Sequence, residues 1–411
     1  MNTFLGVDLG ASNTRFVADD GKFYEVDNNV REVGINEHIR IKPYAANTYE
    51  DRVLNSLDVE IDRLNGESKY IKAKARYLVG PLATRLGASS TPNGLQNKAN
   101  QRINYINAII AVALSKLFLN ADGGDTRLLI GLPPIELSNN ATSEDILKKE
   151  LVGTYKVSFK ADIQREVMFS ISEVVCLEES LLTLICFVFS PNGAYREEAK
   201  PYLTGNVLGI DIGASTTDLG RLIKGHYEEK SGKTIKIGGN FVLDIIADGI
   251  RAEYGYEPGH DELQRAVETG RLEQGAEIID ISEMLAEAKR EYAIELKDKM
   301  KDYFSTMPLS SFKAVVVGGG GSMASSYVNE AGDVIETTAP MSTYLWEEFM
   351  ADSNLSIPFI QVNTDPRHAN IKGLFIRALV EKIAEAQKQK DAQIEAYNKS
   401  LQTGTQLKLN L

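Results

Sequence analysis

Two pairs of short apolar runs, one near the N-terminus and one near the middle of the chain, predict β-hairpins. In the first pair, residues 4–7 precede a glycine-containing turn and residues 16–18 follow it. In the second pair, residues 207–210 and 219–223 are arranged in the same way. Each pair ends at a turn sequence, Asp-Gly at 20–21 or Lys-Gly at 224–225. We therefore expect strand, tight turn and strand, and not the strand-to-helix turn of a P-loop.

Helical periodicity marks three longer segments. Apolar side chains recur every three or four residues in 105–119, 281–300 and 371–379, which predicts amphipathic helices packed on a core. Buried strands are predicted at 128–130 and 314–317. The apolar positions are Ile106, Ile109, Ile110, Ala113, Leu114 and Leu117; Ile281, Met284, Leu285, Ala288, Tyr292, Leu296 and Met300; and Ile371, Leu374, Phe375, Ala378 and Leu379.

Polar stretches separate these elements. Residues 31–100 are mixed and polar, and their loop-like cluster at 87–97 is typical of an insertion. Residues 190–205 have loop composition and are expected to link two domains. The last ~28 residues are rich in Lys, Gln, Glu and Ala, which predicts a solvated helix or a loose tail.

The chain contains an internal repeat. Residues 7–16 have the sequence VDLGASNTRF and residues 210–219 have the sequence IDIGASTTDL. Asp, Gly, Ala, Ser and Thr recur at matching offsets, and each copy follows a predicted strand. The sequence therefore predicts two structurally related halves.

Charge and cysteine content narrow the function classes. The 411 residues include 57 Asp and Glu against 45 Lys and Arg, a formal net charge of −12. This balance argues against direct nucleic-acid binding, which needs a basic surface. Cys176 and Cys186 share one apolar stretch, as expected of buried thiols in a reducing cytoplasm. The N-terminus lacks signal-peptide features and the longest apolar run, 181–189, is too short for a membrane span, so we expect a cytoplasmic protein without a membrane partner.

The repeated loops have the composition of a clamp for phosphate and metal. Asp8 and Asp211 stand at matching strand ends, and facing each other they would suit a hydrated Mg²⁺. Gly10 and Gly213 would let backbone N–H groups approach an anion. Side-chain donors in the loops are Ser12, Asn13, Thr14, Ser215, Thr216 and Thr217. One copy alone would be typical of an ordinary turn, whereas two copies at equivalent places favour the clamp.

A glycine run follows the predicted strand at 314–317. It consists of Gly318, Gly319, Gly320, Gly321 and Ser322. Met323 occupies the third glycine position of a dinucleotide-binding fingerprint, so the Rossmann pattern fails. The run still suits a close approach of the backbone to a flat ring or a phosphate, with a loose turn as the alternative.

These motifs, in this order, resemble the actin-like ATPase superfamily, which includes actin, the bacterial rod-shape proteins, sugar kinases and the ATPase domains of heat-shock chaperones. The segments LLIGLPPIEL, EVVCLEESLLTL and PRHANIKGLF are most similar to plasmid-segregation actins of the ParM/StbA type and to archaeal actin-like proteins. Blocks corresponding to those of the superfamily are the first phosphate loop at 7–16, the first connecting segment at 128–137 or 174–186, the second phosphate loop at 209–222, the adenosine block at 315–328 and the second connecting segment at 364–375.

The resemblance implies an α/β fold of two related domains, each with a mixed sheet of the ribonuclease-H-like kind, and a nucleotide cleft between them. Domain I would span 1–200, with an insertion subdomain at about 31–100, and would be completed by a C-terminal helix at about 366–400. Domain II would span 205–365, with an insertion subdomain at about 245–312.

The resemblance also implies roles for single residues. Asp8 and Asp211 would hold Mg²⁺ through water, and residues 318–322 would line the adenine and ribose of ATP, with GTP left open. The β- and γ-phosphates would lie against Gly10, Ala11, Ser12, Asn13 and Thr14 and against Gly213, Ala214, Ser215 and Thr216. Arg15 stands where the family often has lysine, and it either binds phosphate or points away as part of the second strand.

For hydrolysis, the resemblance makes Glu179 the best match to a water-positioning glutamate, with Glu178 next and Asp211 as the third catalytic candidate. The alternative is a solvated acidic pair at the start of a helix.

The function implied is an ATPase that polymerises into dynamic filaments, disassembles on hydrolysis and segregates plasmid DNA through an adaptor protein. A small-molecule kinase of the sugar-kinase type is the alternative, although no clear sugar-binding block is present. Chaperone and membrane-scaffold functions are less well supported, because neither a peptide-binding domain nor a membrane-binding amphipathic terminus is evident.

Overall fold

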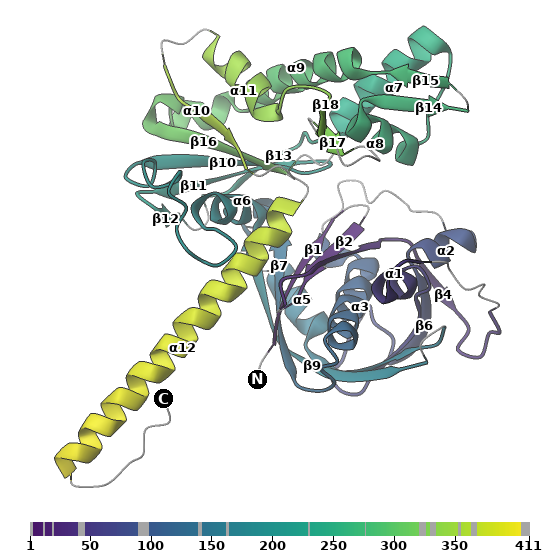
Figure 1. Ribbon diagram of the computed structural model, residues 1–411, viewed down its shortest axis with the longest axis vertical. Coiled ribbons are helices and arrows are strands. Elements are labelled where there is room, and N and C mark those ends of the chain that lie inside the picture. The colour runs from purple at the N-terminus through teal and green to yellow at the C-terminus, as the bar shows by residue number, and fades with distance from the viewer. Residues whose placement is uncertain are drawn as a thin grey trace.

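Two sheet-containing lobes make up the molecule, with a long helix leaving from between them (Figure 1). The computed structural model describes residues 3–403 except for 11–12, 19, 40–45, 89–97, 139–141, 162–163, 229–230, 276, 320–325, 329–333, 352–354 and 363–367. Among the helices described, none has the length and apolarity needed to cross a lipid bilayer. Cys176 and Cys186 are both free thiols, as expected.

The first lobe is built on a nine-stranded mixed sheet with the order β3-β2-β1-β7-β9-β8-β5-β6-β4. Pairing is parallel between β1 and β7 and between β7 and β9, and antiparallel elsewhere. The segment 31–100, expected to be an insertion, contributes strands to this sheet. The strands are β1 Thr3–Leu9, β2 Asn13–Val17, β3 Phe23–Asp27, β4 Val30–Val33, β5 Asp58–Arg63, β6 Lys74–Val79, β7 Asp125–Leu132, β8 Gly153–Phe159 and β9 Glu166–Glu178.

Helix α3 (Arg102–Phe118) supplies the centre of the first core. It is buried along most of its length, which confirms the helix expected at 105–119. Its side chains pack with those of β1, β7 and β9 into one apolar cluster. The other helical elements of this lobe are α1 Tyr49–Leu54, α2 Pro81–Arg85, the 3₁₀ turn Lys98–Asn100, α4 Pro134–Ser138 and α5 Thr142–Leu151.

The second lobe contains a sheet with the order β12-β11-β10-β16-β19, to which β13 adds beside β11. Helix α9 buries the predicted apolar stripe, including Leu285, Tyr292 and Leu296. The strands are β10 Asn206–Ile212, β11 Thr217–Ile223, β12 His226–Tyr227, β13 Lys233–Ile235, β16 Phe312–Gly319 and β19 Phe359–Gln361, with the ribbons β14 Arg271–Gln274 with β15 Glu277–Asp280 and β17 Ser326–Val328 with β18 Val334–Glu336. The helices are α7 Asn240–Tyr254, α8 His260–Thr269, α9 Ser282–Lys299, α10 Lys301–Thr306, the 3₁₀ turn Leu309–Ser311 and α11 Met341–Met350.

Two helices, α6 (Glu179–Val188) and α12 (Ala369–Thr403), lie between the lobes and share an apolar cluster with both sheets. Glycines allow this close packing. A Cβ at Gly209 of β10 would lie 2.8 Å from Leu184 of α6, and a Cβ at Gly373 of α12 would lie 2.8 Å from the Cβ of Leu182. Beyond the junction α12 runs away from both lobes (Figure 1), and its described side chains from 386 to 395 are exposed, as expected of a solvated helix.

Both predicted hairpins are present and equivalent. Strands β1 and β2 pair antiparallel, with Asp8 opposite Arg15, and β10 and β11 pair antiparallel, with Asp211 opposite Asp218. Each first strand also pairs in parallel with a strand from later in its own half, β7 or β16. The carboxyl ends of the first strands, which carry the acidic residues, therefore occupy the same position in both sheets.

Candidate functional site

Three buried carboxylates converge where the two lobes meet. Asp211 ends β10, Asp218 lies opposite it on β11, and Glu179 begins α6 after β9 of the first lobe. One oxygen of each carboxylate lies within 4.8 Å of the others. The sequence analysis did not name Asp218 as a candidate. Its place in the repeat could have indicated it, because Asp218 lies opposite Asp211 just as Arg15 lies opposite Asp8.

Burial and mutual repulsion disfavour the charged forms of these acids. Burial, followed by the charge of Glu179, raises the pKa of Asp211 to about 7, and Asp8 adds to this shift. The pKa of Asp218 is raised from the same two causes, burial first and Glu179 second. The charge of Asp8 also contributes to the raised pKa of Asp211, although Asp8 is not one of the three converging acids.

Hydrogen bonds orient the acids but leave acceptor capacity unused. The Asp211 carboxylate accepts from the Thr183 hydroxyl at 3.1 Å and from the Asn370 amide at 3.1 Å. Asp218 accepts from the Thr234 hydroxyl at 2.6 Å through Oδ1. Its buried Oδ2 has no hydrogen-bond partner among the described residues. An unpaired buried oxygen of this kind is costly unless a cation or a proton joins it.

Lys98 is the positive group of the site, and sequence reasoning missed it. Its ammonium donates to Glu179 Oε1. Burial opposes the charge of Lys98, but Glu179 and Asp8 outweigh burial and raise its pKa above the usual value. Burial raises the pKa of Glu179, which Lys98 partly offsets and Asp8 increases. No sequence motif pointed to Lys98, because it follows a loop-like stretch outside both repeats.

The first phosphate loop is anchored from inside its own lobe. A Cβ at Gly10 would lie 2.6 Å from the backbone oxygen of Asn13, so the turn requires glycine. Asn28 accepts from the Thr14 hydroxyl at 2.7 Å and donates to the Gly10 carbonyl at 2.7 Å. The Asn107 amide donates to the same Asn28 oxygen at 2.8 Å. The Thr14 hydroxyl therefore donates its proton to Asn28 inside the lobe. It was expected to donate to a phosphate, and in this arrangement it does not face outward to do so.

Side chains after this turn lie along the hairpin. The Arg15 guanidinium pairs with Glu25 on β3 at 2.8 Å and stands 3.9 Å from the Asp8 carboxylate. Asn13 donates to the same Glu25. Arg15 therefore lies along strand β2 and beside Asp8. The sequence left open whether Arg15 binds phosphate or belongs to the strand, and this position combines features of both. Ala11 and Ser12, both expected at the phosphates, lie outside the described residues.

The second phosphate loop is closed by backbone bonds from the start of α7. The Gly213 N–H donates to the Thr216 carbonyl at 2.8 Å, and the Gly239 N–H donates to the Gly213 carbonyl at 2.9 Å. The Asn240 N–H donates to the Ala214 carbonyl at 2.7 Å, with its side-chain amide 3.5 Å from the Ser215 hydroxyl. The predicted loop is thus a compact turn at the end of β10.

The glycine run approaches the carboxylates directly. Asp211 pairs with Gly318 and Ile212 with Gly319 across β10 and β16. Gly319 has a φ of +68°, and a Cβ there would lie 2.7 Å from Asp211 Oδ1. Gly320, Gly321 and Ser322 lie outside the described residues.

Glu178, the second catalytic candidate, points elsewhere. Its carboxylate accepts from the Tyr227 hydroxyl of β12 and is not one of the three converging acids. Adjacent residues of an element that changes from strand to helix at this point present their side chains in different directions. Glu179 joins the carboxylate group, while Glu178 contacts the second lobe.

Comparisons with known proteins agree with this architecture. A family model described as the N-terminal domain of actin-like proteins matches residues 6–181, and one described as the C-terminal part of the archaeal actin homologue MreB-like matches residues 209–326. No curated protein gives a significant sequence match.

Solved structures with a similar fold include actin-like protein Alp7A, with a TM-score of 0.70, 18% identity and coverage of 95% of this chain and 100% of that one. ParM from Bacillus thuringiensis with ATP has a TM-score of 0.62 and 14% identity, covering 93% and 99%. A 15-stranded ParM filament from Clostridium botulinum has a TM-score of 0.61 and 16% identity, covering 92% and 99%.

Proposed function

The chain is an actin-like protein, and we propose that it is a nucleoside triphosphatase that binds Mg²⁺-ATP between its two domains, polymerises into filaments and hydrolyses ATP to disassemble them. The observation that carries this proposal is the buried group of Glu179, Asp211 and Asp218, in which Glu179 comes from the start of α6 in the first half and both aspartates come from the hairpin β10–β11 of the second half. ParM structures with ATP and with ADP share the fold and support the choice of nucleotide.

The carboxylate group has the donor set of a hard divalent cation. Oxygen atoms of three acids converge within 4.8 Å, and Asp218 Oδ2 has no partner among the described residues. We assign Mg²⁺ to Asp211 and Asp218, with Asp8 acting through water. When bound, Mg²⁺ would neutralise phosphate charge and favour transfer of the γ-phosphoryl group.

Glu179 is suited to position and deprotonate water. Burial raises the pKa of its carboxylate above the usual value, and a carboxylate within reach of the attacking water can act as a general base. The bond from Lys98 to Oε1 orients the carboxylate, and the ammonium adds positive charge beside it. Glycine at 319 lets β16 pass close to Asp211, because a Cβ there would lie 2.7 Å from Asp211 Oδ1.

We expect copies of this protein to associate with one another, as the copies in a ParM filament of similar fold do. A ParM filament shares the fold, and contacts that do not close on themselves generate filaments. Ten of the twelve net negative charges fall in residues 251–350, where 19 Asp and Glu face 9 Lys and Arg. This distribution would repel DNA and favour a basic adaptor protein that links the filament to a plasmid. Two free thiols are compatible with a cytoplasmic location.

Sedimentation with and without nucleotide tests the proposal. We expect the protein to pellet with Mg²⁺ and ATP or a non-hydrolysable analogue, and to stay in solution with EDTA. Phosphate release should follow assembly with ATP alone, and a parallel series with GTP would define the base preference. A protein that never pellets and consumes ATP only when sugars are added would instead be a small-molecule kinase.

A further inference from the structure

The short helix α4 connects the two domains beside the carboxylates. The Ile135 N–H of α4, in the first domain, donates to the Thr234 hydroxyl oxygen of β13, in the second domain, at 3.2 Å. The Thr234 hydroxyl in turn donates to Asp218 Oδ1 at 2.6 Å. Gly232 permits this approach, since a Cβ there would lie 2.6 Å from the Pro134 side chain. One threonine therefore receives a bond from one domain and orients an acid of the site in the other.

The same helix also orders Lys98. The buried Glu136 carboxylate accepts the backbone N–H groups of Lys98 at 2.8 Å and of Ala99 at 3.2 Å. These bonds hold the 3₁₀ turn from which Lys98 reaches Glu179. Neighbouring residues of α4 thus position the lysine on one side of the site and the Asp218 carboxylate on the other.

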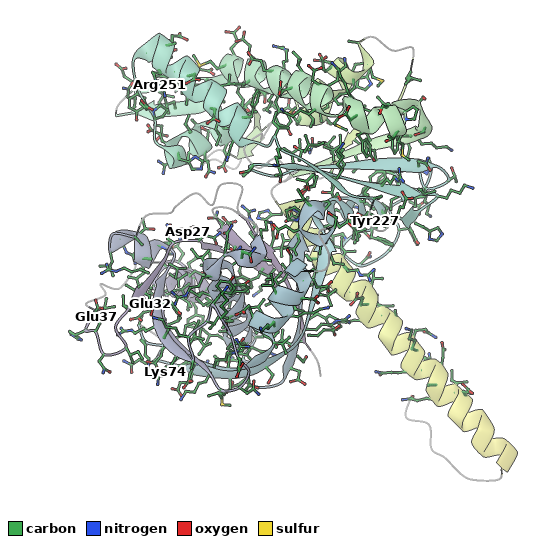
Figure 2. The ribbon with its side chains drawn as sticks, turned by 180° about the vertical axis from the view of Figure 1, so that it is seen from behind. Asp27, Glu32, Glu37, Lys74, Tyr227 and Arg251 are labelled. Atoms are coloured by element: carbon green, nitrogen blue, oxygen red, sulfur yellow. The ribbon has the colours of Figure 1, made fainter. Side chains whose placement is uncertain are left out.

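A second hydrogen bond crosses the domains nearby. Glu178, at the end of β9, accepts from the Tyr227 hydroxyl of β12. Tyr227 lies at the lower edge of the second domain (Figure 2). We call the Ile135–Thr234 and Glu178–Tyr227 bonds together the interdomain latch. Each bond joins a segment of the first domain to a strand of the second, so a rotation that separates these segments would break both bonds.

We propose that Thr234 is a positioning residue that couples domain closure to hydrolysis. With the latch formed, the Ile135 N–H occupies the lone pair of the Thr234 hydroxyl and directs its proton to Asp218. Hydrogen bonds arranged in series in this way polarise and strengthen one another. With the latch open, β13 and Thr234 move away from α4. Helix α4 then still holds Lys98 through Glu136, but it no longer acts on Asp218 through Thr234. This inference rests on the proposed function for its catalytic consequence, but the latch can be measured without nucleotide.

Amide exchange in the nucleotide-free protein tests the latch itself. Thr234→Val removes the hydroxyl while keeping the shape of the side chain. We expect the Ile135 amide to exchange about fivefold faster in this variant, and Thr234→Ser to restore protection. Thr269→Val is the matched control, because among the described residues the Thr269 hydroxyl bonds within the second domain, to the carbonyls of Arg265 and Arg271 and to the Arg271 N–H. Unchanged exchange at Ile135 in Thr234→Val would overturn the latch.

Steady-state turnover tests the coupling. We expect Thr234→Val to lower kcat about tenfold with little change in nucleotide affinity, and Thr234→Ser to recover most of the activity. Tyr227→Phe should lower kcat by less than Thr234→Val does. Tyr256→Phe should leave kcat unchanged, because the Tyr256 hydroxyl bonds to Glu262 at 2.6 Å inside one domain. Equal kcat in Thr234→Val and wild type would refute the coupling. A wild type without ATPase activity would refute the proposed function, whereas the latch would still stand or fall on the exchange rate of the Ile135 amide.

Discussion

The buried carboxylate of Asp211 links the candidate site to the stability of the nucleotide-free protein. Burial, together with the charge of Glu179, raises the pKa of Asp211 from 3.8 to about 7. Since one pKa unit corresponds to about 1.4 kcal/mol, keeping this group ionised in the folded state costs about 4 kcal/mol relative to the unfolded chain. The substitution Asp211→Asn removes the charge and keeps the size of the side chain.

The pH dependence has a definite sign. The unfolded chain releases the Asp211 proton near its ordinary pKa of 3.8, whereas the folded protein retains it up to about pH 7. The free energy of unfolding of the wild type therefore falls across this window and loses nothing further from Asp211 above it. The asparagine should be tolerated, because Asn370 Oδ1 has no partner among the described residues and can accept from the new amide if Asn370 turns.

Urea unfolding in EDTA, followed by circular dichroism, measures the effect. We expect the free energy of unfolding of Asp211→Asn to exceed that of the wild type by up to about 4 kcal/mol at pH 8 and by much less at pH 5. Asp58→Asn is the control, because Asp58 is a buried carboxylate bonded to the Arg76 guanidinium at 2.7 and 2.6 Å and should lose stability at both pH values. A destabilised Asp211→Asn at pH 8, or the same difference at both pH values, would refute the reasoning.

Three further substitutions separate the roles within the site. Glu179→Gln should leave nucleotide-driven sedimentation intact while slowing phosphate release by about a hundredfold or more, and unchanged release would remove Glu179 from the water-positioning role. Asp218→Asn should weaken Mg²⁺ binding to the nucleotide-bound protein by about tenfold or more in a titration, and an unaltered affinity would exclude Asp218 as a ligand. Gly319→Ala should lower the free energy of unfolding by about 2 kcal/mol or more, because its φ is +68° and its Cβ would approach Asp211; thermal unfolding measures this, and a neutral result would mean that β16 can move aside.

Much of the fold was predictable because its signals are local or repeated. The hairpins at both acidic loops, the buried helix α3 and the stripe on α9 are confirmed, and each follows from periodicity or turn composition within about 20 residues. The resemblance to actin-like proteins and the two-domain α/β architecture are also confirmed. The strands in 31–100 could not be placed, because β5 pairs with β8 from Arg63–Tyr155 to Val59–Phe159, a separation of 92 to 100 residues, and polar composition says nothing about such a partner.

The candidate site was predictable where it follows the repeat or, for Glu179, where the resemblance to a family pointed to it. Asp8 and Asp211 were proposed from their matching strand ends, and Asp218 could have been proposed from the same register. Lys98 carries no pattern, since its role depends on Glu136 holding its backbone and on Glu179 accepting from its ammonium. The contrast between Glu178 and Glu179 is also tertiary, because it depends on whether the neighbour is Tyr227 or the other acids.

Mutual repulsion among the buried carboxylates of Glu179, Asp211 and Asp218 gives a reason why the junction between the domains would respond to nucleotide. A domain core ordinarily excludes unpaired charge, yet Asp218 Oδ2 is buried without a partner among the described residues, and the charge of Glu179 raises the pKa of both Asp211 and Asp218. Around them α6 and the first turns of α12 pack apolar side chains against both sheets. A cation that relieves this repulsion binds the closed arrangement more tightly than an open one, and only such a difference in affinity can shift the equilibrium between the two. The latch at α4 would then be stabilised together with the carboxylate group, because Asp218 is held by Thr234 and Lys98 is held by Glu136.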